Sequence, residues 1–291
     1  MWSGVKIIQY FFIILLSFVN TALVVHFMLK SSSTNGWKTR SSLLLFLFSI
    51  IIVSCCYVQF SVIWLLYTFD LLNDLSYVNI LFMLSGNITT SVRIFYDTTT
   101  IILLCHRICS IKWPVRHMDF GLFTISLISL AVTSASCSAL LYNGFVVLGS
   151  KCISTSKAVN ESGLCDTGTT VYNSLFFGMR LAFSVLVVIV GVVFHLVYRQ
   201  YNRQLVTVHN SKVNRFVMCI FYLKVILEVV PFACDNILRS TIGVSVATYI
   251  GAYGALGGVL DPFLCCCAYL IPFMQKSKKT TPQMQITIIR G

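Results

Sequence analysis

Long apolar runs separated by short polar stretches dominate the hydrophobic pattern of this chain. Each run is long enough for a helix to cross the hydrocarbon core of a bilayer, which takes about 20 residues. Because backbone N–H and C=O groups in lipid must bond within their own segment, every run is predicted to be helical. The short alternating segments typical of membrane β-barrels do not occur. The predicted spans are residues 5–29, 42–67, 77–104, 120–148, 172–198, 216–238 and 242–270.

Composition agrees with an all-α membrane protein, here a seven-transmembrane helix bundle. The chain is 57% hydrophobic and 10% charged, with a mean hydropathy of +0.86. Soluble domains carry about 25% charged residues, and a soluble core has no room for this much apolar surface. We assign residues 1–272 to the bundle and residues 273–291 to a short cytoplasmic tail.

Lys and Arg residues predict the orientation of the bundle, because cytoplasmic loops are enriched in them. One set of loops holds fourteen of the 21, the opposite set holds four, and three lie inside predicted helices. The N-terminus is therefore predicted to be outside and the C-terminus cytoplasmic. The net charge of +12 comes mostly from this asymmetry, so we expect the anionic inner leaflet as its partner and no nucleic acid. The fourteen are Lys30, Lys38, Arg40, Arg107, Lys112, Arg116, Arg199, Arg203, Lys212, Arg215, Lys276, Lys278, Lys279 and Arg290.

The longest predicted outer loop, residues 143–170, has the features of an extracellular segment. Asn160 opens a glycosylation sequon, which is a candidate glycan site although such triplets also arise by chance. Cys152 and Cys165 flank it and are a candidate disulfide in an oxidising exterior. A second sequon begins at Asn87, inside the third predicted span, and is expected to stay unused.

Cysteine and histidine positions give no sign of a metal site or an active site. The other ten cysteines fall mostly in predicted helices, where they pack as small apolar residues, and acylation of residues 265–267 is the alternative. The spacing that zinc requires is missing, so no metal or other cofactor is expected. No histidine is predicted at mid-membrane beside a serine, and no glycine-rich phosphate loop occurs, so an enzyme is not expected.

Ionisable residues inside the predicted spans carry more information. Each is costly in lipid, so each should face the interior of the bundle and have a partner. The charges balance, and two opposite pairs are each spaced four residues apart on one helix face. The pairs either stabilise packing or form a polar ligand pocket or switch between helices. The six residues are Arg93, Asp97, Arg180, Lys224, Glu228 and Asp261.

The sequence leaves two pairing schemes open for these charges. The favoured scheme pairs Arg93 with Asp97, because a spacing of four residues brings them together without any tertiary contact. In the alternative, Asp97 meets Lys224 of the sixth span. Arg93 then faces an anionic group of a ligand, together with Arg180.

The third predicted span ends in a motif. Residues 106–114 read His-Arg-Ile-Cys-Ser-Ile-Lys-Trp-Pro. This resembles the Asp-Arg-Tyr-x-x-Ile-x-x-Pro stretch that closes the third helix of rhodopsin-like G-protein-coupled receptors. Arg107, Ile111 and Pro114 match, while His and Ile replace the family's Asp and Tyr.

Other positions extend the resemblance over nearly the whole chain. Asp261-Pro262 is similar to the Asn/Asp-Pro of the family's seventh helix, although Cys265 stands where its Tyr would be. Asn20 looks like the first-helix Asn. Pro231 looks like the sixth-helix Pro.

Departures from the family pattern narrow the resemblance. The acidic residue of the second helix and the Trp of the fourth are missing, and Phe82 stands where the third-helix Cys would fall. These differences argue against an opsin or an amine receptor. Short loops and a short tail are similar to the nematode serpentine chemoreceptors, and residues 91–93 (Ser-Val-Arg) and 214–215 (Asn-Arg) look like receptor class BC.

The resemblance implies a plasma-membrane receptor of sensory neurons or their cilia. A small external molecule would bind between the outer halves of the helices, and a heterotrimeric G protein would bind the cytoplasmic face. Residues implied in coupling and switching are Arg107, Ile111, Pro114, Pro231, Asp261 and Pro262. Residues implied in lining the ligand site are Thr89, Arg93, Asp97, Arg180, Phe232, Asp235, Tyr249 and Tyr253.

Two other classes of function stay open at this stage. Buried charges also suit a ligand-gated channel or a small-solute transporter, although the inverted repeat with paired broken helices that marks many transporters is not visible. A membrane scaffold or lipid-handling protein is the other class, but it gives the buried charges no use.

Overall fold

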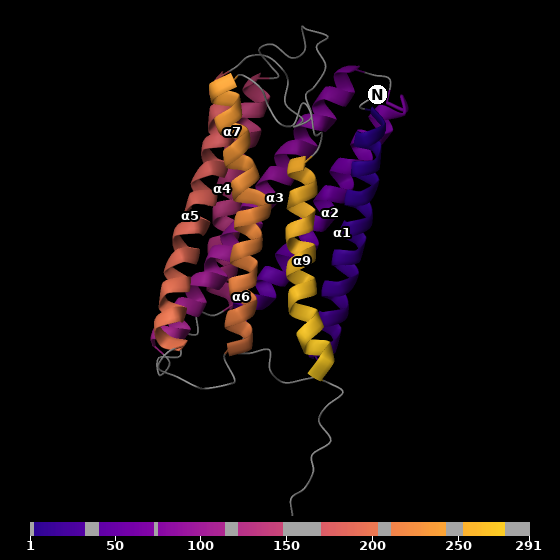
Figure 1. Ribbon diagram of the computed structural model, residues 1–291. Helices are drawn as coiled ribbons and strands as arrows, with labels where there is room; N and C mark the ends of the chain where they lie inside the picture. The colour runs from indigo at the N-terminus through magenta and orange to yellow at the C-terminus, as the bar shows by residue number, and fades with distance from the viewer. Residues whose placement is uncertain are drawn as a thin grey trace, which may run out of the picture.

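In the computed structural model, the part of the chain that is described is almost entirely helical (Figure 1). That part covers residues 3–32, 41–72, 75–113, 122–147, 170–202, 211–242 and 253–276, and none of these residues lies in a strand. The helices are α1 (Ser3–Ser32), α2 (Ser41–Thr68), α3 (Leu75–Lys112), α4 (Leu122–Val147), α5 (Thr170–Asn202), α6 (Ser211–Lys224), the π-helical η3 (Val225–Val229), α7 (Val230–Ile242) and α9 (Tyr253–Lys276).

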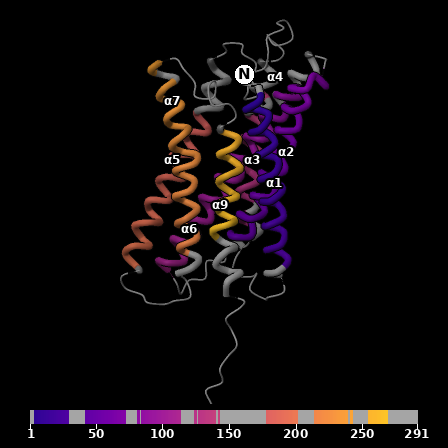
Figure 2. The backbone as a smooth tube through the Cα atoms, turned by 45° about the vertical axis from the view of Figure 1, so that its right-hand side comes forward, coloured from indigo at the N-terminus to yellow at the C-terminus, as the bar shows by residue number. Residues whose placement is uncertain are grey.

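These helices lie side by side along one common direction (Figures 1 and 2). The helices α6, η3 and α7 follow one another without a break and form a single rod. Helix α3 contacts α2, α4, α5 and α6, which places it at the centre, and α9 contacts α1, α2 and α6. Helix α1 begins at one end of the bundle and α9 ends at the other (Figure 1).

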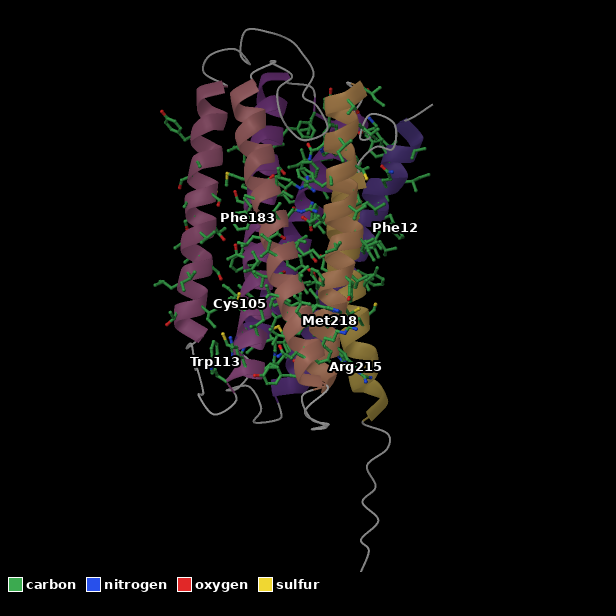
Figure 3. All side chains as sticks on the ribbon, turned by 60° about the vertical axis from the view of Figure 1, so that its left-hand side comes forward. Phe12, Cys105, Trp113, Phe183, Arg215 and Met218 are labelled. Carbon is green, nitrogen blue, oxygen red and sulfur yellow. The ribbon has the colours of Figure 1, made fainter. Side chains whose placement is uncertain are left out.

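Among the described residues, five stretches of helix are long and apolar enough to cross a membrane: Gly4–Leu29, Ser42–Thr68, Leu84–Lys112, Gly178–Tyr201 and Asn214–Leu238. Two shorter apolar helices, Leu127–Ala139 and Gly254–Ala268, lie beside them. Large apolar side chains point outward, as Phe12 does in Figure 3, which a soluble surface would not tolerate over whole helices. The described part of the protein is therefore a set of helices whose outer surface suits lipid.

Helix ends differ most from the predicted spans at the end of α3 and at the start of α9. Helix α3 continues to Lys112, beyond the predicted end of the third span, because helical hydrogen bonding continues after the apolar run stops. Helix α7 occupies Ile242, where the last span was predicted to begin, and α9 starts at Tyr253. Residues 243–252 lie outside the described part.

The π-helical turn sits directly before Pro231. Proline has no N–H, so it cannot bond the carbonyl of Leu227 four residues earlier. The backbone widens here, and the N–H of Val230 bonds the carbonyl of Val225 instead. Helix α9 packs closely on this turn, since a Cβ on Gly257 would lie 2.8 Å from the Leu227 carbonyl oxygen. A glycine is therefore required where α9 meets the widened turn.

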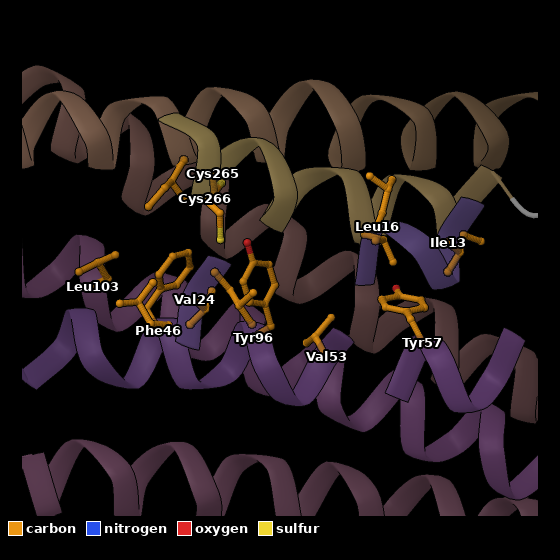
Figure 4. Packing of buried hydrophobic residues seen from close by; sticks show 14 of the residues in the cluster. Ile13, Leu16, Val24, Phe46, Val53, Tyr57, Tyr96, Leu103, Cys265 and Cys266 are labelled. Carbon is orange, nitrogen blue, oxygen red and sulfur yellow. The ribbon is translucent and has the colours of Figure 1, made fainter. Parts of the chain in front are cut away.

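Aromatic packing holds the centre of the bundle together. The ring centres of Trp64 and Phe82 lie 4.5 Å apart, and those of Phe46 and Tyr96 lie 5.5 Å apart. Phe82 is fully buried, so its side chain serves in packing. Figure 4 shows Tyr96 with its hydroxyl directed toward the helix that carries Cys265.

Candidate functional site

Four buried charges connect α3 to the rod formed by α6 and η3. Lys224 pairs with Asp97, and the Nε of Arg93 donates to Oε1 of Glu228 at 3.0 Å. The ammonium of Lys224 also lies 3.5 Å from Oε2 of Glu228. Side-chain exposure is 12% for Arg93 and 4% or less for the other three, so the network is shielded from solvent. The four charges cancel, which burial at this depth requires.

The favoured prediction, an intrahelical pair between Arg93 and Asp97, is wrong. Both residues pair across to the rod, because α3 and the rod run in opposite directions. Four residues forward along α3, from Arg93 to Asp97, correspond to four residues back along the rod, from Glu228 to Lys224. Asp97 therefore meets Lys224, and Arg93 meets Glu228. The Lys224–Glu228 contact within the rod is confirmed. The alternative scheme is half right: Asp97 does meet Lys224, but Arg93 already has a carboxylate.

Arg93 uses its remaining donors to join two further helices. Its Nη1 donates to the Tyr57 hydroxyl of α2 at 2.9 Å and to the Gly254 carbonyl of α9 at 3.2 Å. A Cβ on Gly258 would overlap the Tyr57 hydroxyl and lie 3.0 Å from Nη1, so glycine leaves the space for this contact. Sequence reasoning missed Tyr57, although a phenol within an apolar span requires a hydrogen-bond partner.

A second polar group extends the network to Asp261 on α9. The Tyr96 hydroxyl donates to Oδ2 of Asp261 at 2.9 Å, and the Cys265 thiol donates to Oδ1 at 3.6 Å. The Lys224 ammonium lies 4.1 Å from the centre of the Tyr96 ring, which is a cation–π contact. Tyr96 therefore links the ion pairs to the Asp-Pro step of α9, where Pro262 is also buried. The sequence analysis did not single out Tyr96.

Polar contacts continue toward the end of the bundle that carries Arg107. The side-chain amide of Asn20 donates to the carbonyl of Val259, next to the Asp-Pro step, at 3.3 Å. The hydroxyl of Ser42 lies 2.8 Å from Nδ1 of His106, tying α2 to the end of α3. Arg107 is half-buried beside this contact. Figure 3 places Trp113, which directly follows α3, and Arg215 of α6 at this same end.

The other predicted site residues are spread around the network. Arg180 of α5 stacks on Phe232 of α7, with the guanidinium carbon 4.5 Å from the ring centre. Thr89 bonds back to the carbonyl of Ser85 on its own helix at 2.8 Å and does not join the ion pairs. Asp235 is buried on α7.

Several predicted positions are not brought into this site. Ile111 is half-buried and packs against the main apolar core, near the end of α3. Tyr253 is the first residue of α9, and Pro231 is half-buried directly after the π-helical turn. The predicted residues that lie outside the described part are Pro114, Cys152, Asn160, Cys165 and Tyr249.

Comparison with protein-family models and with curated proteins gives no match for this chain. In the described ranges, no three His, Cys, Asp or Glu side chains gather as metal ligands would. Function is therefore inferred from the residues and from their geometry.

Proposed function

We propose that this chain is a seven-transmembrane chemosensory G-protein-coupled receptor of the plasma membrane. It binds a small external molecule and activates a cytoplasmic G protein, with its N-terminus outside and its C-terminus cytoplasmic. The observation that carries this proposal is the buried charge network that joins α3, the α6–η3–α7 rod and α9. Charges within a membrane bundle mark functional elements, because apolar residues of similar volume would hold the helices at lower cost.

The network supports the proposal because it lies between the end of the bundle where we place the ligand and the end where we place the G protein. On one side, Arg180 and Phe232 face the predicted outer half. On the other, α3 continues from Asp97 to Arg107 without a break. A ligand that favours one arrangement of the rod shifts the population of bundle states. The π-helical turn before Pro231 is the natural point of movement, since it already departs from regular helix.

The motifs at residues 106–114 and at Asp261-Pro262 assign the direction of signalling by resemblance to rhodopsin-like receptors, and the subclass most similar to this chain is nematode receptor class BC. Expression in sensory neurons or their cilia belongs to the same proposal.

Epitope accessibility tests the proposed orientation. A tag before Trp2 is expected to bind antibody on intact cells, and a tag after Gly291 is expected to bind only after permeabilisation, because fourteen of 21 Lys and Arg residues lie on the predicted inner side. Antibody access to the C-terminal tag on intact cells would reverse the assignment.

A ligand-gated channel is the second candidate function, because buried charges also line ion pathways. A panel of small organic compounds, screened in cells that carry a second-messenger reporter, separates the two. We expect responses that disappear when the heterotrimeric G proteins are removed. A compound-evoked current that persists without G proteins would favour the channel instead.

A further inference from the structure

Arg180 differs from Arg93 and Lys224, the two cations of the charge network. Within the described residues, Arg93 and Lys224 each pair with a carboxylate, whereas no carboxylate lies within ion-pair distance of Arg180. Its Nε is buried and has no hydrogen-bond partner among the residues that the structure describes. Its guanidinium instead lies 4.5 Å from the ring of Phe232. Part of the Arg180 surface remains accessible, so the group is shielded but not sealed.

The nearby carboxylates are already engaged. Glu228 forms ion pairs with Arg93 and Lys224, and Asp97 forms an ion pair with Lys224. Asp261 accepts hydrogen bonds from Tyr96 and Cys265. Asp235 has an interaction of its own. Among the described residues, Arg180 therefore has no carboxylate that pairs with its charge.

Such an arrangement is unfavourable for the protein alone. A buried donor without an acceptor loses its hydration and receives nothing in exchange. Repulsion from Arg93 adds to this cost, and attraction to the more distant Glu228 and Asp97 carboxylates offsets it in part. Intramembrane arginine of this kind is expected to have an anionic partner, and in the described part of the chain the protein does not provide one.

We infer that Arg180 binds the anionic group of the external ligand, and that the ligand is a small organic acid with a carboxylate. This inference rests on the proposed function, because it places the acid in the receptor's ligand site. A carboxylate offers the planar pair of acceptors that a guanidinium recognises. Phe232 holds the guanidinium by a cation–π contact, as aromatic rings do in arginine sites, and such a contact uses none of the N–H donors. Arg93 has no such role, because Glu228 already neutralises it.

Ligand-induced thermal stabilisation of the purified full chain in detergent tests the inference. The probes are butyrate, hexanoate, octanoate, benzoate and phenylacetate, each compared with its methyl ester. We expect at least one acid, and not its ester, to raise the unfolding temperature of the wild type. Arg180→Met is expected to weaken the binding of that acid by about tenfold or more, since a charged hydrogen bond is lost. Arg180→Lys is expected to keep part of the effect, because it keeps the charge.

Arg215→Met is the matched control, since it removes an exposed arginine at the opposite end of the bundle. It is expected to respond to acids as the wild type does. Two results overturn the inference: esters that stabilise as well as their acids, or a full panel in which no acid separates the wild type from Arg180→Met. Because Arg180 has no carboxylate partner in the described residues, its replacement is not expected to prevent folding.

The same experiment separates this inference from the proposed function. Binding in detergent requires no G protein, so acids that bind through Arg180 but evoke no G-protein response leave the inference standing and overturn the receptor. Neutral or cationic agonists that evoke equal G-protein responses from the wild type and from Arg180→Met support the receptor and overturn the inference.

Discussion

Lys224→Met is expected to lower the free energy of unfolding by about 3–5 kcal/mol, the usual cost of removing one partner from a buried ion pair. Lys224 is 1% exposed and contacts both Asp97 and Glu228, so its loss leaves two buried carboxylates with one cation. The cation–π contact with Tyr96 is lost as well. Thermal unfolding of the purified protein and its level at the cell surface should both show the loss.

Two double variants test which carboxylate, Asp97 or Glu228, requires Lys224 as its ion-pair partner. Lys224→Met with Asp97→Asn leaves the Arg93–Glu228 pair intact, so it is expected to recover most of the lost stability. Lys224→Met with Glu228→Gln leaves Arg93 and Asp97 without their partners across the interface and is expected to stay unstable. An intrahelical Arg93–Asp97 pair would reverse this order. Better recovery with Glu228→Gln than with Asp97→Asn would therefore contradict the pairing described above.

Arg107→Ala is expected to reduce G-protein activation by about tenfold or more, in the range of typical coupling free energies. Arg107 lies on the same helix as Arg93 and Asp97, at the end of the bundle where α3 ends and α6 begins. Its neighbour His106 bonds Ser42 and cannot offer the carboxylate that the family's Asp provides, so basal activity of the wild type is expected to be high. Surface level and acid-induced stabilisation should stay unchanged, which separates a coupling defect from misfolding. A variant with normal activation would remove Arg107 from the mechanism.

The apolar helices and the burial of the charges could be predicted because each follows from a local rule. Apolar runs marked the helices, since a bilayer sets their length. Lys224 and Glu228 were expected to pair from their spacing alone, and they do. Asp261 and Pro231 were found by motif and by residue type.

The partners across helices could not be predicted, because they depend on how two helices are aligned. The pairing of Arg93 with Glu228 follows from the opposed directions of α3 and the rod, and no local pattern fixes that register. Tyr57 and Gly254 became partners of Arg93 only once α2 and α9 were in place. The π-helical turn also depends on context, since proline alone predicts a kink without its form.

Guanine-nucleotide exchange on purified heterotrimeric G proteins tests the central claim most directly. The full chain is reconstituted in lipid vesicles, and binding of a non-hydrolysable GTP analogue is followed with the G-protein classes in turn. The account predicts that wild-type vesicles accelerate exchange on at least one class over empty vesicles, and that Arg107→Ala vesicles at equal protein level do not. Exchange at the rate of empty vesicles for every class, with and without the organic acids, would contradict the assignment of this chain as a G-protein-coupled receptor.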